Sequence, residues 1–207
     1  MSTAATLGLA CIGLAALAAA GCADGPDAGE ANEPDGQSAD NFVERIASHC
    51  GNAYAGRITA NEPEQANDPF ANQPLVMHVR ECNADELKIP FYVGDDRSRT
   101  WVLTRTGDGL RLKHDHRHED GTPDAVTMYG GDTADPGTAA RQEFPVDADS
   151  IAMFEREGLT ASLVNVWAME IEPGQRFVYE LARPGTDRLF RVEFDLTTPA
   201  ATPPPPR

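Results

Sequence analysis

Apolar residues alternate with polar ones along much of the chain after Gly51, and this period of two restricts the possible folds more than any other feature. Successive side chains of a β-strand point to opposite faces of its sheet, so the alternation predicts strands with one buried and one solvated face. The clearest examples are residues 75–79, 87–93 and 190–196. The pattern therefore predicts a mainly β protein.

Turn sequences separate the strand candidates. Segments of two to five residues that contain glycine, proline or aspartate are typical of antiparallel hairpins, and they occur at residues 83–85, 106–109, 172–175 and 183–186. A short N-terminal helix is predicted over residues 41–50 and one short internal helix over residues 150–157. We expect an antiparallel meander of about eight or nine strands. Closure into a small barrel, complete or partial, is favoured because it removes both sheet edges.

The N-terminal residues predict export. Residues 3–21 carry no charge, and their apolar core at residues 7–20 is fourteen residues long. That length is below the roughly 20 residues needed to span a bilayer and suits a signal peptide. The small residues before Cys22 resemble a bacterial lipobox, which implies that residues 1–21 are removed and that Cys22 is lipidated. A plain secretory signal peptide is the alternative.

Composition divides the rest of the chain into three parts. Residues 22–41 contain six acidic side chains and no basic one, which predicts a flexible acidic tether. Residues 42–197 are predicted to form a single β domain, and the Pro-rich residues 198–207 a disordered tail. The net charge of −16 argues against nucleic acid as a partner.

The lipobox resemblance also implies a location. A lipid on Cys22 would hold the protein on a membrane of the bacterial cell envelope. Because Ala23 follows it where aspartate would retain a lipoprotein at the inner membrane, we expect the outer membrane, facing the periplasm. Without lipidation the protein would be secreted. The sequence indicates no cofactor and no particular oligomeric state.

Two of the four cysteines remain for the β domain, since Cys11 lies in the signal peptide and Cys22 takes the lipid. In an oxidising compartment the pair Cys50 and Cys82 predicts a disulfide. Closing a loop of about 30 residues adds roughly 3–4 kcal/mol in the loop-entropy description. The alternative, a metal site that uses both thiolates, lacks a Cys-x-x-Cys spacing.

Residues 110–118 hold the densest group of side chains that could bind a ligand or a metal ion. In a strand, the even positions share one face, so His114, His116 and His118 should follow Leu110 and Leu112 toward the interior. The odd positions, Arg111, Lys113, Asp115 and Arg117, should point to solvent. A two-residue turn within residues 107–109 places this strand opposite another that carries Arg97, Arg99, Trp101, Leu103 and Arg105 on one face.

Three interpretations of this hairpin are open. The first is a site for a small polar or anionic ligand, because arginine matches carboxylate or phosphate and histidine adds a donor; its residues would be Arg97, Arg99, Trp101, His114, His116 and His118. The second is a metal site or metal-dependent enzyme using His114 and His116, whose side chains leave one face about 7 Å apart. The third is a structural lipoprotein in which these side chains are exposed or pair with Glu170, Glu180 or Asp195.

The first interpretation makes an electrostatic prediction. The charge of Arg99 should keep His116 and His118 mostly neutral at pH 7, and the affinity for an anion should rise as the pH falls from about 8 to 5.5. No catalytic residue is predicted, because the chain has no Gly-x-Ser-x-Gly, no phosphate-binding glycine loop and no His-Glu-x-x-His.

The runs Asp-Arg-Ser-Arg-Thr-Trp at residues 96–101 and Lys-His-Asp-His-Arg-His-Glu-Asp-Gly at residues 113–121 resemble a group of uncharacterised bacterial secreted proteins. The resemblance covers most of residues 45–197 and implies export and a shared fold, but no activity. A short helix that leads into a strand containing Gly56 is also loosely similar to the lipocalin-type barrels.

Replacing Cys22 by serine tests the lipid. We expect wild-type protein expressed in bacteria to enter the detergent phase, and the Cys22→Ser protein to stay in the aqueous phase with altered gel mobility, because serine has no thiol to acylate. A Cys22→Ser protein that still enters the detergent phase with unchanged mobility would contradict lipidation.

Overall fold

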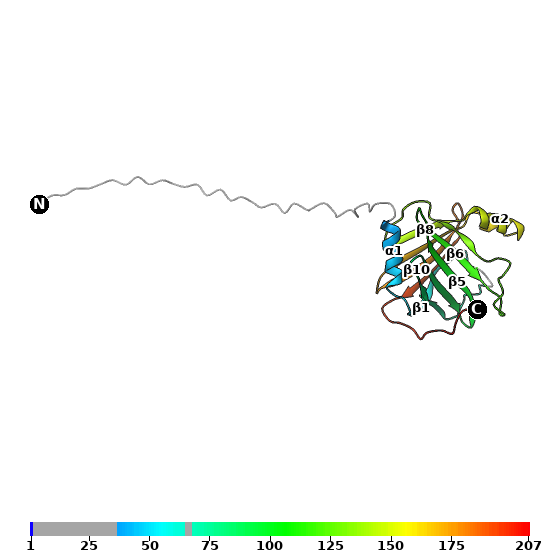
Figure 1. Ribbon diagram of the computed structural model, residues 1–207, viewed down its shortest axis with the longest axis horizontal. Helices are drawn as coiled ribbons and strands as arrows, with labels where there is room; N and C mark the ends of the chain where they lie inside the picture. The colour runs from blue at the N-terminus through cyan, green and yellow to red at the C-terminus, as the bar shows by residue number, and fades with distance from the viewer. Residues whose placement is uncertain (2–36, 65–67) are drawn as a thin grey trace. The chain divides into compact units, whose positions relative to one another are not determined.

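The structure, a computed structural model, describes Met1 and residues 37–64 and 68–207. The chain divides into two units, Met1–Asn32 and Glu33–Arg207, and all described helices and strands belong to the second (Figure 1). The predicted signal peptide after Met1, Cys22 and residues 23–36 lie outside the described residues. None of the described helices is long and apolar enough to cross a membrane.

The described elements are two α-helices, one short 3-10 helix and eleven strands. In chain order they are α1 (Gln37–Ala47), β1 (Ala53–Glu62), β2 (Leu75–His78), β3 (Glu81–Cys82), β4 (Glu86–Val93), β5 (Asp96–Arg105), β6 (Leu110–His116), β7 (Tyr129–Asp132), β8 (Arg141–Pro145), α2 (Ala148–Arg156), η1 (Thr160–Ser162), β9 (Val166–Glu172), β10 (Arg176–Ala182) and β11 (Leu189–Asp195).

The strands form one antiparallel sheet that is nearly closed into a barrel, which confirms the predicted fold class. The strand order is β7-β6-β5-β4-β2-β1-β11-β10-β9-β8, and β3 pairs with β4 beside this path. The structure has more strands than the eight or nine expected. The additional ones carry little alternation, because β3 has two residues and β7 reads Tyr-Gly-Gly-Asp.

Helix α1 lies against β8 and β9 near one end of the barrel and buries Phe42, Val43 and Ile46 in the core. It begins at Gln37, so the last residues of the predicted tether, 37–41, are helical. Burial of Ser38 and Ala39, together with an ion pair between Asp40 and Arg105, explains this earlier start.

The predicted disulfide is present. Cys50, which follows α1, is bonded to Cys82 on β3, with 6.3 Å between the Cα atoms. The bond ties the end of α1 to the sheet, and in the loop-entropy description it stabilises the fold by restricting the unfolded chain.

The Pro-rich residues 198–207, predicted to be disordered, lie instead along the sheet. The Ala200 N–H donates to the Ala53 carbonyl at 2.7 Å, and the Tyr92 hydroxyl donates to the Pro204 carbonyl at 3.1 Å. Arg97 donates to the Pro205 carbonyl at 3.0 Å. Proline has no N–H but keeps its carbonyl acceptor, so the prolines of this segment are held by donors that the barrel supplies, Tyr92 and Arg97.

The barrel closes between β7 and β8, which stand at the two ends of the strand order. A Cβ atom on Gly131 would lie 1.7 Å from the Pro145 carbonyl oxygen, so the two backbones meet with no room for a side chain. The Gly130 carbonyl accepts hydrogen bonds from the Asp147 N–H at 2.9 Å and from the Ser150 hydroxyl at 3.1 Å. The first turn of α2 therefore completes the closure.

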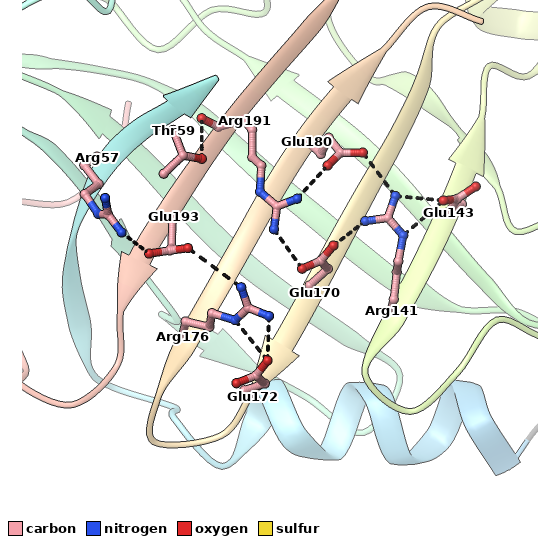
Figure 2. Close-up of polar contacts among 10 residues, drawn as sticks. All are labelled: Arg57, Thr59, Arg141, Glu143, Glu170, Glu172, Arg176, Glu180, Arg191 and Glu193. Atoms are coloured by element: carbon pink, nitrogen blue, oxygen red, sulfur yellow. Dashed lines mark hydrogen bonds and ion pairs between the residues drawn. The ribbon is translucent and has the colours of Figure 1, made fainter. Parts of the chain in front are cut away.

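The outer face of β8, β9, β10 and β11 carries a ladder of paired charges (Figure 2). Arg141 contacts Glu143, Glu170 and Glu180, and Arg191 contacts Glu170 and Glu180. Glu170 and Glu180 therefore pair with arginines of β8 and β11. The structural interpretation of the sequence had instead paired them with side chains of the His/Arg hairpin.

Replacing Gly131 by alanine tests the closure. The new methyl group would overlap a backbone oxygen that cannot move without separating β7 from β8, so we expect a loss of about 2–3 kcal/mol or more in the free energy of unfolding. Gly107 is the matched control, because a Cβ atom there meets nothing within 4 Å. Equal stability of Gly131→Ala and Gly107→Ala in urea titrations would contradict the described closure.

Candidate functional site

A cavity of about 380 Å³ opens at the barrel end away from α1. Its walls come from the ends of β4, β5, β6, β7, β9, β10 and β11 nearest that opening, together with α2 and the turns around them. The volume falls near the lower end of the roughly 300–1,000 Å³ of small-molecule sites.

The structure brings four of the six predicted ligand-binding residues to this cavity: Arg99, Trp101, His114 and His116. The hairpin has the expected register, with Arg99 opposite His116 and Trp101 opposite His114. The inward face predicted from alternation is therefore correct where β5 and β6 pair regularly.

Arg97 and His118 do not line the cavity. The β4–β5 register shifts between Phe91 and Val93, so that one extra residue of β5 lies there and the inward parity of Arg97 is lost. Strand β6 ends at His116, and the His118 side chain is 56% exposed, 3.9 Å from Asp124. Both departures occur where the regular ladder stops.

The outward residues of β6 are also less exposed than predicted. Lys113 forms an ion pair with Asp147, the N-cap of α2, and its side chain is only 13% exposed. Arg111 does face solvent, paired with Asp132 at 2.6 Å. Lys113 is covered because β7 and α2 close over β6.

His114 is fully enclosed and has a defined tautomer. Its Nδ1 lies 3.1 Å from the Tyr129 carbonyl oxygen, which can only accept, so Nδ1 carries the proton. Its Nε2 lies 2.8 Å from the Tyr179 hydroxyl and accepts from it. The pKa of His114 is lowered to about 3, mainly by burial and to a smaller extent by the neighbouring His116. The imidazole is therefore neutral and serves as a polar crosslink inside the barrel.

His116 lies nearer the opening and contacts the Tyr129 hydroxyl through Nε2 at 3.2 Å. Burial, followed by the charge of Arg99, lowers its pKa to about 4. The neutrality expected of His116 at pH 7 therefore holds, and the other histidine of the cavity, His114, is neutral as well. Burial places the pKa of His116 in the ligand-free protein below the range from pH 8 to 5.5. The rise in anion affinity over that range stays a prediction.

The metal interpretation does not fit this geometry. Nδ1 of His114 carries the proton, and the lone pair of Nε2 accepts from the Tyr179 hydroxyl, so neither ring nitrogen is available to a metal ion. Within residues 37–64 and 68–207, no group of three His, Cys, Asp or Glu side chains is arranged to hold a metal ion. The cavity therefore offers hydrogen-bonding groups and fixed charges.

Two further arginines line the cavity that the sequence analysis did not select. Arg183 donates through Nε to Asn165 Oδ1 at 2.8 Å and through Nη2 to Ser162 Oγ at 3.5 Å. Arg188 donates through Nη1 to Asn61 Oδ1 at 2.8 Å. Burial, and secondarily Arg188, lowers the pKa of Arg183.

The sequence contained part of the information needed to select Arg183 and Arg188. Arg183 begins the predicted turn at residues 183–186 and Arg188 lies two residues after it, and a hairpin turn places both at the same end of the sheet. The sequence alone did not show that this end is also the end of the hairpin that carries His116.

Comparison with known proteins gives no assignment, since no family model, curated protein or solved structure matches this chain. The function is therefore inferred from the cavity.

His114→Gln tests the buried imidazole, because the glutamine amide can also donate one hydrogen bond and accept another. The unfolded histidine binds a proton near its pKa of about 6.5, whereas the buried one stays neutral until about 3. Wild-type stability should therefore fall as the pH drops through this window, by a few kcal/mol in order of magnitude from this residue. His114→Gln should lack that part of the loss in urea titrations from pH 7 to 4. Identical pH profiles would contradict the neutral buried state.

Proposed function

We propose that this protein is an exported, lipid-anchored binding protein that holds a small polar or anionic ligand in its barrel cavity. The supporting observation is the charge of the lining. Among the described residues, the lining contains three arginines, Arg99, Arg183 and Arg188, and one carboxylate, Asp124. Both histidines of the cavity are neutral at pH 7. In a chain of net charge −16, a locally cationic cavity attracts a small anion and not an extended polyanion.

The proposal also includes a cellular location for the barrel. The lipobox-like residues before Cys22 would put it on the bacterial envelope, facing the periplasm at the outer membrane. The Cys50–Cys82 disulfide is compatible with that oxidising compartment. The acidic residues after Cys22 would separate the barrel from a negatively charged lipid surface.

Two triple variants with the same change in charge test the proposal. One replaces the cavity arginines Arg99, Arg183 and Arg188 by alanine, and the other replaces Arg57, Arg111 and Arg176, which form ion pairs on the outer surface. Acetate, citrate and phosphate are titrated against each protein and wild type by calorimetry. We expect the cavity variant to lose at least about 100-fold in affinity, since each lost charged hydrogen bond is worth about 1.5–3 kcal/mol.

The surface variant should stay within about threefold of wild type, because its charges lie outside the cavity. Equal losses in both variants would show that only diffuse charge attracts the anion. Absence of binding by wild-type protein to any of these anions, and to the aromatic probes described below, would contradict the proposed function and favour a structural envelope lipoprotein.

A further inference from the structure

A row of nearly parallel aromatic rings lines the cavity. Phe91 and Trp101 have ring centroids 4.9 Å apart at an interplanar angle of 14°, and Trp101 and Tyr179 are 4.5 Å apart at 21°. Phe70 extends the row beyond Phe91, at 6.0 Å and 16°. All four rings belong to the cavity wall. A wall of this kind favours a flat apolar body, because aromatic pairs gain energy beyond the area they bury.

The three arginines of the cavity differ in how their charge is compensated. Arg99 forms an ion pair with Asp96 and lies 5.5 Å above the Phe70 ring. Arg183 and Arg188 have no ion-pair partner among the described residues, and their recorded hydrogen bonds go to neutral side chains and a backbone carbonyl. The uncompensated positive charge therefore lies at the β10–β11 turn and not on the β5–β6 hairpin, where the sequence had placed the ligand site.

The surroundings of Arg183 orient its side chain without neutralising it. Asn165 is 4% exposed and precedes β9, and its amide oxygen fixes the guanidinium at Nε. A guanidinium held in this way is ready to donate to a planar carboxylate in a fixed orientation. The charge of Arg188 is close enough to contribute to the lowered pKa of Arg183, and an anion between them would relieve that repulsion.

We infer that the cavity binds an aromatic carboxylate, with the carboxylate at Arg183 and Arg188 and the ring against the row that contains Phe91, Trp101 and Tyr179. This inference rests on the proposed function and narrows it, since a simple inorganic anion would use the arginines and leave the aromatic wall unfilled. A cavity of about 380 Å³ has room for such a small molecule.

The probes are 2-naphthoate, its neutral counterpart 2-naphthamide, and inorganic phosphate. Binding can be followed by intrinsic fluorescence, because the chain has two tryptophans and both, Trp101 and Trp167, line the cavity. We expect naphthoate to bind about tenfold or more tightly than either naphthamide or phosphate. Naphthoate should also compete with naphthamide for one site.

Arg183→Ala should weaken naphthoate binding about tenfold or more and leave naphthamide within about twofold, which separates loss of the charge from damage to the cavity. Arg188→Ala should act in the same direction and covers the case in which Arg183→Ala fails to fold. Arg57→Ala is the control, because its side chain is 73% exposed and pairs with Glu193 on the outer face.

Each part of the inference can fail separately. Equal affinities for naphthoate and naphthamide, or an Arg183→Ala protein with unchanged naphthoate affinity, would overturn the carboxylate position. Phosphate binding as tight as naphthoate binding would overturn the aromatic body and leave the proposed anion-binding function in place. If wild-type protein binds none of these probes, both the aromatic-carboxylate inference and the proposed anion-binding function are contradicted.

Discussion

The approach of the β7 backbone to residues 145–147 controls more of this structure than any other contact. Because Gly130 and Gly131 carry no side chains, the first strand in the spatial order can reach the last one, and the N-terminus of α2 supplies donors to the Gly130 carbonyl. Tyr129 directly precedes these glycines. Its carbonyl fixes the proton of His114, and its hydroxyl contacts His116. The closure of the barrel thus positions the group that fixes the tautomer of His114 and the hydroxyl that contacts His116.

Neutral histidines leave the electrostatics of the cavity to the arginines. An imidazole with a pKa of about 3 or 4 contributes hydrogen bonds and ring surface near pH 7, but no charge. The three guanidiniums come from two separate parts of the chain, β5 and the β10–β11 turn. In the part of the chain that the structure describes, only the arginine on β5 has a carboxylate partner, so the charge available to a ligand is concentrated on the opposite hairpin.

Local periodicity was sufficient to predict the fold class and the inward face of the Arg99–His116 hairpin, and counting the cysteines was sufficient to predict the disulfide. Each of these depends on alternation or on residue counting within a short segment. Arg97 was misplaced because a register shift beside Phe91 leaves no mark in the sequence pattern. Arg183 and Arg188 were missed because their position relative to His116 depends on how the whole sheet closes. The Pro-rich segment was expected to be free because its partners, Tyr92 and Arg97, lie more than a hundred residues away in the chain.

The charged ladder of Figure 2 also bears on how the strands find their alignment. A slip of two residues between neighbouring strands keeps every apolar side chain inside, so hydrophobic alternation cannot detect it. Such a slip in one direction would set Glu143 opposite Glu170 or Glu170 opposite Glu180, and between β10 and β11 it would set Glu180 opposite Glu193. A slip in the other direction would remove the direct pairs Arg141 with Glu170 and Glu180 with Arg191. The outer surface thereby selects among alignments that the interior would accept equally.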